Sequence, residues 1–266
     1  MIAKVVLIGS GHVANHLGRQ LHKRGIIINQ LVARNKTQAD LLAKDLNTLV
    51  NYNLDQVVRK ADAYLLCVND DAIAEVSTLL TQRLSDEKTI IHFSGSKSYE
   101  EINPYFKKRA VIWPLQSFSE NAKLNWKQIP FFIDGELSIV NEILDFCKGL
   151  KWNGIPVDQE KKKLIHLAAV FANNFSNFNY VIAEQILNSI QIEFKVLEAI
   201  LNNSSAHVFE MGPEKMQSGP ARRKDAGIIK KQISLLQTKF PEYKKIYEDY
   251  SKLIINHYHG SKNFKK

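Results

Sequence analysis

Short apolar runs alternate with amphipathic segments over the first 150 residues of the chain. The runs are rich in β-branched side chains, which is typical of buried strands, and they lie at residues 4–9, 26–33, 63–68, 89–95, 110–114 and 130–134. The amphipathic segments have apolar side chains at three- and four-residue spacing, which predicts helices at residues 13–24, 37–46, 71–83 and 138–150. This alternation predicts a doubly wound parallel sheet with helices on both faces, the Rossmann arrangement.

The pattern changes after residue 156. Residues 159–190 contain neither proline nor glycine, and their apolar side chains form one broad stripe, which predicts a single long helix with Asp158 as its N-cap. Further helices are predicted at 193–210, 222–239 and 241–258. The predicted fold class is therefore α/β, with a Rossmann domain at 1–156 and an all-α domain at 157–266 for substrate binding and dimerisation.

Composition narrows the classes of protein. The formal net charge is +9, which favours anionic partners such as phosphates and acidic metabolites, but no nucleic-acid motif and no zinc-ligand spacing accompany it. No apolar stretch is long enough to span a membrane, and the N-terminus lacks the pattern of a signal peptide. The two cysteines, Cys67 and Cys147, lie in apolar runs and predict buried free thiols. We expect a cytoplasmic protein without a metal site that binds neither nucleic acid nor membrane.

The first predicted strand runs into a glycine bend. Gly9, Gly11 and Ala14 fit the pattern Gly-x-Gly-x-x-Gly/Ala, in which the first glycine allows the tight turn and the second lets the backbone approach a pyrophosphate. The candidate binding residues of this bend are Gly9, Ser10, Gly11, His12 and Val13, at the start of the first helix. The alternative is a glycine turn with a purely structural role.

The second predicted strand ends in a basic turn. An NAD site usually has an acidic residue here for the ribose hydroxyls, but this chain has Arg34, Asn35, Lys36 and Thr37. A guanidinium, an amide, an ammonium and a hydroxyl suit a 2′-phosphate, so the turn predicts NADP as the cofactor. The alternative is a solvated basic turn. The ends of two further strands add Val68, Asn69 and Ser94 as candidate cofactor-binding residues.

Several short stretches carry a resemblance to known proteins. They are the glycine bend, residues 68–73 (VNDDAI), 92–95 (HFSG), 114–118 (PLQSF), 166–174 (HLAAVFANN) and 219–225 (GPARRKD). The chain resembles the 6-phosphogluconate-dehydrogenase-like and pyrroline-carboxylate-reductase-like superfamily. Within it, the chain is similar to bacterial NADP oxidoreductases, some of them described as deazaflavin-dependent. The resemblance implies a Rossmann domain followed by a helical domain whose substrate is unassigned. Asn69, Trp113 and Lys224 depart from the group, which has proline, histidine and a small residue at these positions.

The predicted long helix carries a polar line. At about 100° per residue, His166, Asn173 and Asn177 fall on one line opposite the apolar stripe, and Lys162 lies one turn before His166. The resemblance implies a lysine and an asparagine one turn apart on this helix, one as general acid/base and one as substrate anchor. An imidazole that titrates near pH 6.5 can exchange a proton near neutrality, so His166 is the predicted general acid/base and Asn173 the predicted positioning group. The alternative is a polar face toward water or a partner subunit.

These observations together predict an NADP-dependent oxidoreductase. It transfers a hydride between the nicotinamide and a small carbonyl, alcohol or imine substrate. Arg223, near the start of a later helix, could hold a carboxylate or phosphate of an anionic substrate, or it could pair with Asp225 to organise the turn. Apolar helix surface in the second half predicts a homodimer. The alternative function is that of a non-catalytic NADP-binding sensor or regulatory protein.

Overall fold

The computed structural model describes residues 2–120 and 122–260. The chain divides into two compact units, Met1–Ala172 and Asn173–Lys266. The division lies later in the chain than the boundary predicted at residues 156 and 157, because the first turns of the long helix pack on the first unit. The sheet itself ends at Pro156, so a domain boundary at that point remains a prediction.

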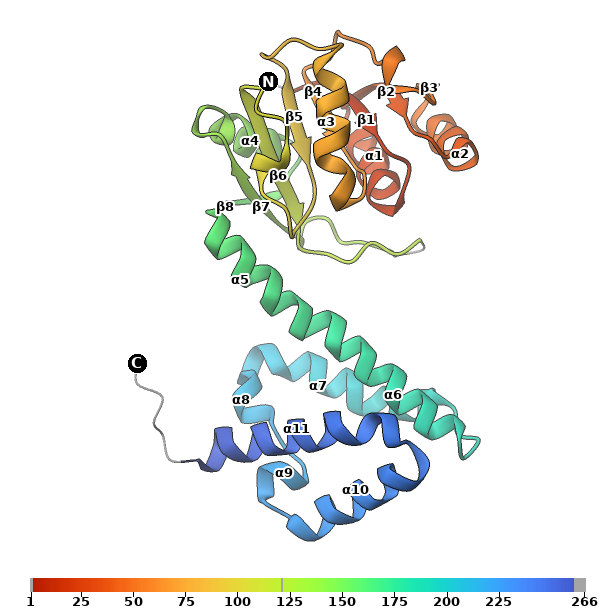
Figure 1. Ribbon diagram of the computed structural model, residues 1–266, viewed down its shortest axis with the longest axis vertical. Helices are drawn as coiled ribbons and strands as arrows, with labels where there is room; N and C mark the ends of the chain where they lie inside the picture. The colour runs from red at the N-terminus through yellow and green to blue at the C-terminus, as the bar shows by residue number, and fades with distance from the viewer. Residues whose placement is uncertain (1, 121, 261–266) are drawn as a thin grey trace. The chain divides into compact units, whose positions relative to one another are not determined.

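One sheet of eight strands forms the centre of the first unit. Its order is β3-β2-β1-β4-β5-β6-β7-β8. The strands are β1 (Lys4–Ile8), β2 (Ile27–Val32), β3 (Leu49–Asn51), β4 (Ala63–Leu66), β5 (Thr89–His92), β6 (Lys108–Pro114), β7 (Pro130–Gly135) and β8 (Asn153–Pro156). All neighbours are parallel except β6 and β7, which pair antiparallel. The predicted Rossmann sheet is confirmed, and the carboxyl ends of β1, β2, β4 and β5 share one edge (Figure 1).

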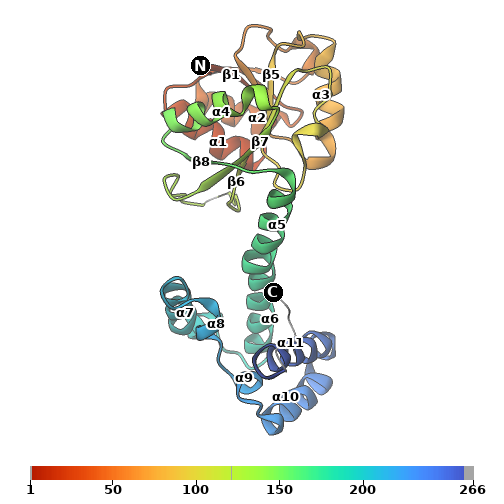
Figure 2. The same ribbon diagram turned by 90° about the vertical axis from the view of Figure 1, so that its left-hand side faces the viewer.

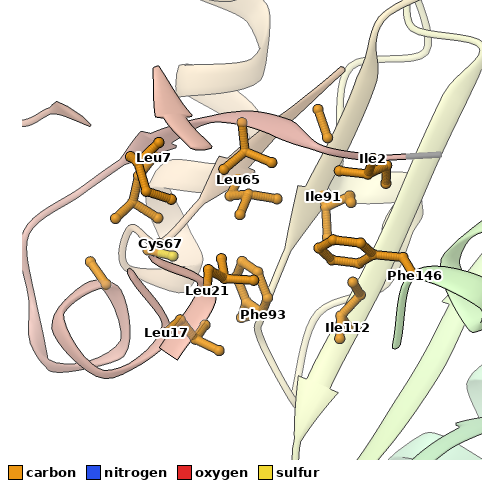
Figure 3. Packing of buried hydrophobic residues seen from close by; sticks show 14 of the residues in the cluster. Ile2, Leu7, Leu17, Leu21, Leu65, Cys67, Ile91, Phe93, Ile112 and Phe146 are labelled. Atoms are coloured by element: carbon orange, nitrogen blue, oxygen red, sulfur yellow. The ribbon is translucent and has the colours of Figure 1, made fainter. Parts of the chain in front are cut away.

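Helices cover both faces of this sheet. Figure 2 shows α1 (His12–Lys23), α2 (Lys36–Leu46) and α4 (Leu137–Gly149) on one side of the strands and α3 (Ile73–Thr81) on the other. Leu17 and Leu21 of α1 pack with Leu7, Leu65 and other strand residues in the larger core cluster (Figure 3). Strands that are buried on both faces have nearly continuous apolar sequences, and these apolar runs are the pattern from which the strands were predicted.

A third, smaller cluster lies where the sheet meets the next helix. Val111 and Trp113 of β6 and Phe132 of β7 are buried together, and Ile165 of α5 (Gln159–Ala169) packs against them. Asp158 caps α5 as predicted, because its carboxylate accepts a hydrogen bond from the Lys161 backbone N–H at 2.7 Å. The packing of Ile165 on this cluster attaches α5 to the sheet.

The prediction of one continuous α-helix over residues 159–190 was wrong in its middle. A π-helical segment, Val170–Phe175, separates α5 from α6 (Ser176–Asn188). A π-helix bonds each residue to the fifth one along, so it contains more residues per turn than an α-helix. The 100° spacing that placed His166, Asn173 and Asn177 on one line therefore does not hold across this segment.

The second unit is helical, as predicted. It contains α6, α7 (Glu198–Met211), α8 (Pro213–Met216), α9 (Pro220–Arg223), α10 (Ala226–Lys239) and α11 (Pro241–His259). The helices α10 and α11 pack against each other and against α9 (Figure 1). Lys224 separates α9 from α10 in a left-handed conformation, with φ of 58°, a region that glycine adopts more easily than lysine. Within the described part of the chain, no helix is long and apolar enough to cross a membrane.

Candidate functional site

The glycine bend has the backbone that a dinucleotide site needs. Gly9 has a φ of +114°, and a Cβ at this position would lie 2.1 Å from the carbonyl oxygen of Cys67, so only glycine fits. Gly11 has open space around the position of its absent Cβ, and it forms the N-cap of α1 without a side-chain cap. The first backbone N–H groups of α1 are therefore available, and a phosphate can approach the backbone at Gly11.

Asn15 holds this bend in place, a role that sequence reasoning missed. Its side-chain amide donates to the carbonyl oxygens of Ser10 at 2.9 Å and Gly11 at 3.1 Å. The Asn15 amide thus holds both carbonyls against α1, where the Gly11 carbonyl also accepts the backbone N–H of Asn15 at 3.0 Å. Asn15 lies one turn into α1, so the signal that could have found it is a donor side chain four residues after the second glycine.

The predicted basic turn lies at the end of the neighbouring strand β2. Arg34, Asn35, Lys36 and Thr37 are all exposed. Asn35 caps α2, since its side-chain oxygen accepts a hydrogen bond from the Gln38 N–H at 3.2 Å. Its amide nitrogen is thus the part that could reach a phosphate.

Two side chains lie next to this turn. The ammonium of Lys36 lies 5.3 Å from the centre of the Tyr52 ring, and the Tyr52 hydroxyl donates to the Asp40 carboxylate at 2.5 Å. Asp40 is the nearest carboxylate in sequence to the turn, and it is held by Tyr52. Binding of an anion at the turn stays a prediction.

The loop that follows β5 is ordered by its own serine. The Ser94 hydroxyl accepts hydrogen bonds from the backbone N–H groups of Ser96 at 3.2 Å and Lys97 at 3.1 Å. Ser96 in turn donates to the Asp70 carboxylate at 2.5 Å, which ties the loop to the end of β4. Ser94 thus shapes the loop, whereas Val68 and the exposed Asn69 lie beside it after β4.

His92 is buried beneath this loop in its neutral form. Its Nδ1 accepts a hydrogen bond from the Ser94 N–H at 3.2 Å, so Nε2 carries the proton and donates to the Ser98 carbonyl at 2.9 Å. Burial lowers the pKa of His92 to about 4, and the nearby charge of Lys162 adds to this effect. The imidazole therefore acts as a fixed support for the loop near neutral pH.

Lys162, which was predicted to lie near the polar line of the helix, is buried against the same loop. Its side chain is 2% exposed, and its Nζ donates to the backbone carbonyl of Lys97. Burial lowers the pKa of Lys162 to about 8, although Asp134 and Asp70 oppose this effect. The structure thus places an ammonium of unusual acidity under the loop that follows β5.

His166 lies one turn further along α5 and is half-buried. Its ring centre is 5.6 Å from that of Trp113, the residue that replaces the histidine of similar proteins. A Cβ on Gly95 would lie 2.6 Å from the Trp113 ring and 2.8 Å from His166, so the loop, the indole and the imidazole are in close contact. The structure thus brings His166 to the edge of the sheet where Ser94 lies.

The other predicted residues of the helical half belong to the second unit. Asn173 lies in the π-helical segment and Asn177 in α6, and both are exposed. Asp225 caps α10 by accepting a hydrogen bond from the Ile228 N–H at 3.1 Å, so it organises the turn after Arg223. Among the described residues, no group of three or more His, Cys, Asp or Glu side chains is placed to hold a metal ion.

The fold defines a Rossmann domain with a glycine bend at the end of β1, followed by a helical domain. Residues 4–94, which contain this bend, match the family described as NADP oxidoreductase, coenzyme F420-dependent. Residues 129–254 match a second family, described as a domain of unknown function, DUF2520. No curated protein matches the chain.

Solved structures extend the likeness over nearly the whole chain. A Bacteroides fragilis protein with a provisional NADP oxidoreductase name is 28% identical, with a TM-score of 0.88 over 96% of this chain and 98% of that one. The protein TM1727 from Thermotoga maritima is 21% identical, with a TM-score of 0.74 over the same shares. An imine reductase from Myxococcus stipitatus in complex with NADP⁺ is 12% identical, with a TM-score of 0.65 over 95% and 92%. The predicted resemblance to NADP oxidoreductases is confirmed, and the last two structures show the shared fold alone.

Proposed function

We propose that this protein is an NADP-dependent oxidoreductase that transfers a hydride between the nicotinamide and a small carbonyl, alcohol or imine substrate. The observation that carries the proposal is the pairing of two features at neighbouring strand ends: the open backbone at Gly11 and the exposed basic turn that begins at Arg34. The family match of residues 4–94 and the 28% identity to the Bacteroides fragilis protein support it.

The residues of the first unit fit NADP. The backbone of residues 9–13 would hold the pyrophosphate, because Gly9 and Gly11 leave room and the start of α1 offers N–H groups. The residues after β2 would hold the 2′-phosphate, namely Arg34, Asn35, Lys36 and Thr37. Val68, Asn69 and Ser94 would line the nicotinamide end, since ligands of such sheets lie at the carboxyl ends of the strands.

His166 is the group we propose for proton transfer. When bound, the reduced cofactor supplies a hydride to the substrate carbon, and the reaction needs one proton at the substrate oxygen or nitrogen. His166 donates that proton in the reduction and accepts it in the reverse reaction. The Trp113 ring and Gly95 hold the imidazole at the edge of the sheet, and the ammonium of Lys162 adds positive charge one turn away. Asn173 is proposed to position the substrate, for which an anionic group suits the surplus of positive charge.

Binding and turnover of NADPH test this proposal. We expect saturable binding of NADPH in calorimetry at moderate ionic strength, and oxidation of NADPH with members of a panel of small carbonyl and imine compounds. His166→Gln should lower kcat by about 10²- to 10⁴-fold, the usual value of a general acid, and leave NADPH affinity unchanged.

The outcomes distinguish the alternatives. Absence of saturable NADPH binding overturns the proposal. Binding without turnover of any compound in the panel favours a non-catalytic sensor. A pH–rate profile that keeps the same limb in His166→Gln removes this residue from the chemistry.

We further propose that the helical half, placed at residues 157–266, carries substrate-binding and dimer-forming surfaces and that the protein works in the cytoplasm as a homodimer. The cysteines Cys67 and Cys147 are free and buried, which fits a reducing compartment.

A further inference from the structure

A row of three side chains runs across the sheet beneath α5. The strand register pairs His92 of β5 with Val111 of β6, and Val111 with Asp134 of β7. Residues directly opposite each other in neighbouring strands point to the same face, so His92 and Asp134 lie on either side of Val111. Val111 belongs to the cluster that α5 covers, which places both polar side chains under this helix.

Asp134 is an unusual residue for this position. It is 7% exposed, and among the described residues its Oδ2 is buried without a hydrogen-bond partner. An unpartnered carboxylate oxygen is costly to bury unless a positive charge lies near. Burial raises the pKa of Asp134, and the attraction of Lys162 opposes that effect.

Lys162 supplies positive charge to this region, and its attraction lowers the pKa of the Asp134 carboxyl. It is buried as well, and it points its ammonium at the Lys97 carbonyl of the loop after β5. An ammonium has three donors and the Lys97 carbonyl uses one of them. The charged and titratable groups that act on Lys162 are Asp134 from β7, Asp70 from the end of β4 and the neutral His92 from β5. Glu100 and Asp158 act on Asp134, and both raise its pKa.

We propose that Asp134 is a positioning residue that keeps Lys162 charged beneath the loop of residues 94–98, and that Asp134 and Lys162 together set an alkaline limit of the reaction in addition to the one that loss of the His166 proton sets. The second part rests on the proposed oxidoreductase function. Above that limit Lys162 loses its proton, and with it the positive charge that holds the loop carbonyl and lies one turn from His166. Asp70 also raises the pKa of Lys162, but Asp134 has the larger effect of the two carboxylates.

The direction of the effect follows from the charges. Burial lowers the pKa of Lys162 to about 8, while Asp134 raises it. Replacing Asp134 with asparagine keeps the shape of the side chain and removes its charge. The titration of Lys162 should then move to lower pH by about one unit, the smaller end of the range for a neighbouring opposite charge.

The test follows Lys162 directly. Lysine labelled with ¹³C at Cε reports the charge of each ammonium in an NMR titration, and Lys162→Met identifies the signal. We expect Asp134→Asn to lower the midpoint of this signal by about one pH unit. The control Glu100→Gln removes a carboxylate that faces Asp134 but is not among the groups that act on Lys162, and it should leave the midpoint unchanged. An unchanged midpoint in Asp134→Asn overturns the proposal.

Activity provides the second measurement. In His166→Gln, where loss of the His166 proton no longer contributes, Asp134→Asn should move the remaining alkaline limb of NADPH oxidation by the same amount as the Lys162 titration. A limb that stays in place while the titration moves overturns the role in setting the pH limit. If no compound oxidises NADPH, the proposed function fails, and the NMR titration still decides whether the pair exists.

A second variant covers the case in which Asp134→Asn does not fold. In Lys162→Met, the ¹³C-labelled carboxyl of Asp134 should titrate at higher pH than in the native protein, because the attraction that opposes its burial is gone. A carboxyl titration that does not change overturns the pair.

Discussion

Arg34 is the residue on which the choice of cofactor depends. It is exposed directly after β2, and its forked guanidinium can bond a 2′-phosphate in two places. We expect Arg34→Asp to weaken NADPH binding by about 10- to 100-fold, the value of a charge-assisted hydrogen bond, and to weaken NADH binding much less. Calorimetry with both dinucleotides measures the two dissociation constants.

A matched variant separates this contact from a general loss of charge. Lys44→Asp makes the same change of charge at the exposed far end of α2, and it should leave the preference for NADPH over NADH intact. Equal losses of NADPH and NADH affinity in Arg34→Asp would refute the 2′-phosphate role.

Individual residues differ in how far the sequence reveals them. The tight turn at Gly9 was predictable because it depends on the local backbone, and so was the exposed basic turn at Arg34, because it follows a strand; their roles in cofactor binding stay predictions. Asn15, Asp134 and the burial of Lys162 were not, because each depends on contacts between segments that are far apart in the chain or on a side-chain direction. Lys162 is one of three consecutive lysines at 161–163, a pattern typical of surface charge. Its burial follows only from the packing of α5 on the sheet.

At the scale of elements, buried strands were predictable and exposed ones were not. The four-residue strands β4 and β5 are fully buried and apolar runs mark them, whereas β3 and β8 are exposed or half-buried and no such run marks them. The antiparallel pairing of β6 with β7 depends on the direction in which the two strands cross the sheet, and no local sequence pattern shows that direction. The π-helical segment also escaped prediction, because its sequence remains compatible with an ordinary helix and the backbone bonding differs.

The contact between the loop after β5 and α5 gives the prediction that belongs to this scale. A methyl group on Gly95 would lie 2.6 Å from Trp113 and 2.8 Å from His166, so α5 and the loop would have to separate. Overpacking of this kind costs about 1–3 kcal/mol. We expect Gly95→Ala to lower the free energy of unfolding by that amount in urea denaturation, and to lower kcat because His166 is displaced.

Gly149 provides the control for this substitution. It lies at the end of α4, and a Cβ there would meet no atom within 4 Å. Gly149→Ala should therefore unfold at the same urea concentration as the native protein or slightly above it. A Gly95→Ala variant as stable as Gly149→Ala would show that the loop and α5 are not tightly packed.

At the scale of the whole molecule, the two units differ in how well they bury apolar side chains. The sheet unit has two extended core clusters, whereas in the described positions 173–260 the buried residues are Ala221, Leu236 and Ser251. Large apolar side chains remain exposed in the helical unit, including Phe178, Val196, Ile200, Phe209 and Leu253. A monomer rarely leaves so much apolar surface in water, so we expect a second copy of the chain to cover it.

Area supports this expectation. A stable interface buries roughly 800 Å² on each partner, and one aromatic side chain offers about 150–250 Å². Phe209 alone is 92% exposed, and several other large apolar side chains of the same unit are more than half exposed. The exposed apolar side chains of the helical unit are therefore the surface that we expect a homodimer interface to use.

Self-association is the measurement that decides this question, and the chain offers a matched pair of variants for it. We expect sedimentation equilibrium at micromolar concentration to give the mass of a dimer, and Phe209→Asp to shift it toward the monomer because a buried charge without a partner opposes association. Leu137→Asp makes the same kind of change at a side chain that is 94% exposed on α4 of the sheet unit, and it should leave the dimer intact. A native protein that stays monomeric would show that this surface forms no homodimer. A dimer that Leu137→Asp disrupts and Phe209→Asp does not would place the interface elsewhere, since association would then not depend on the apolar surface of the helical unit.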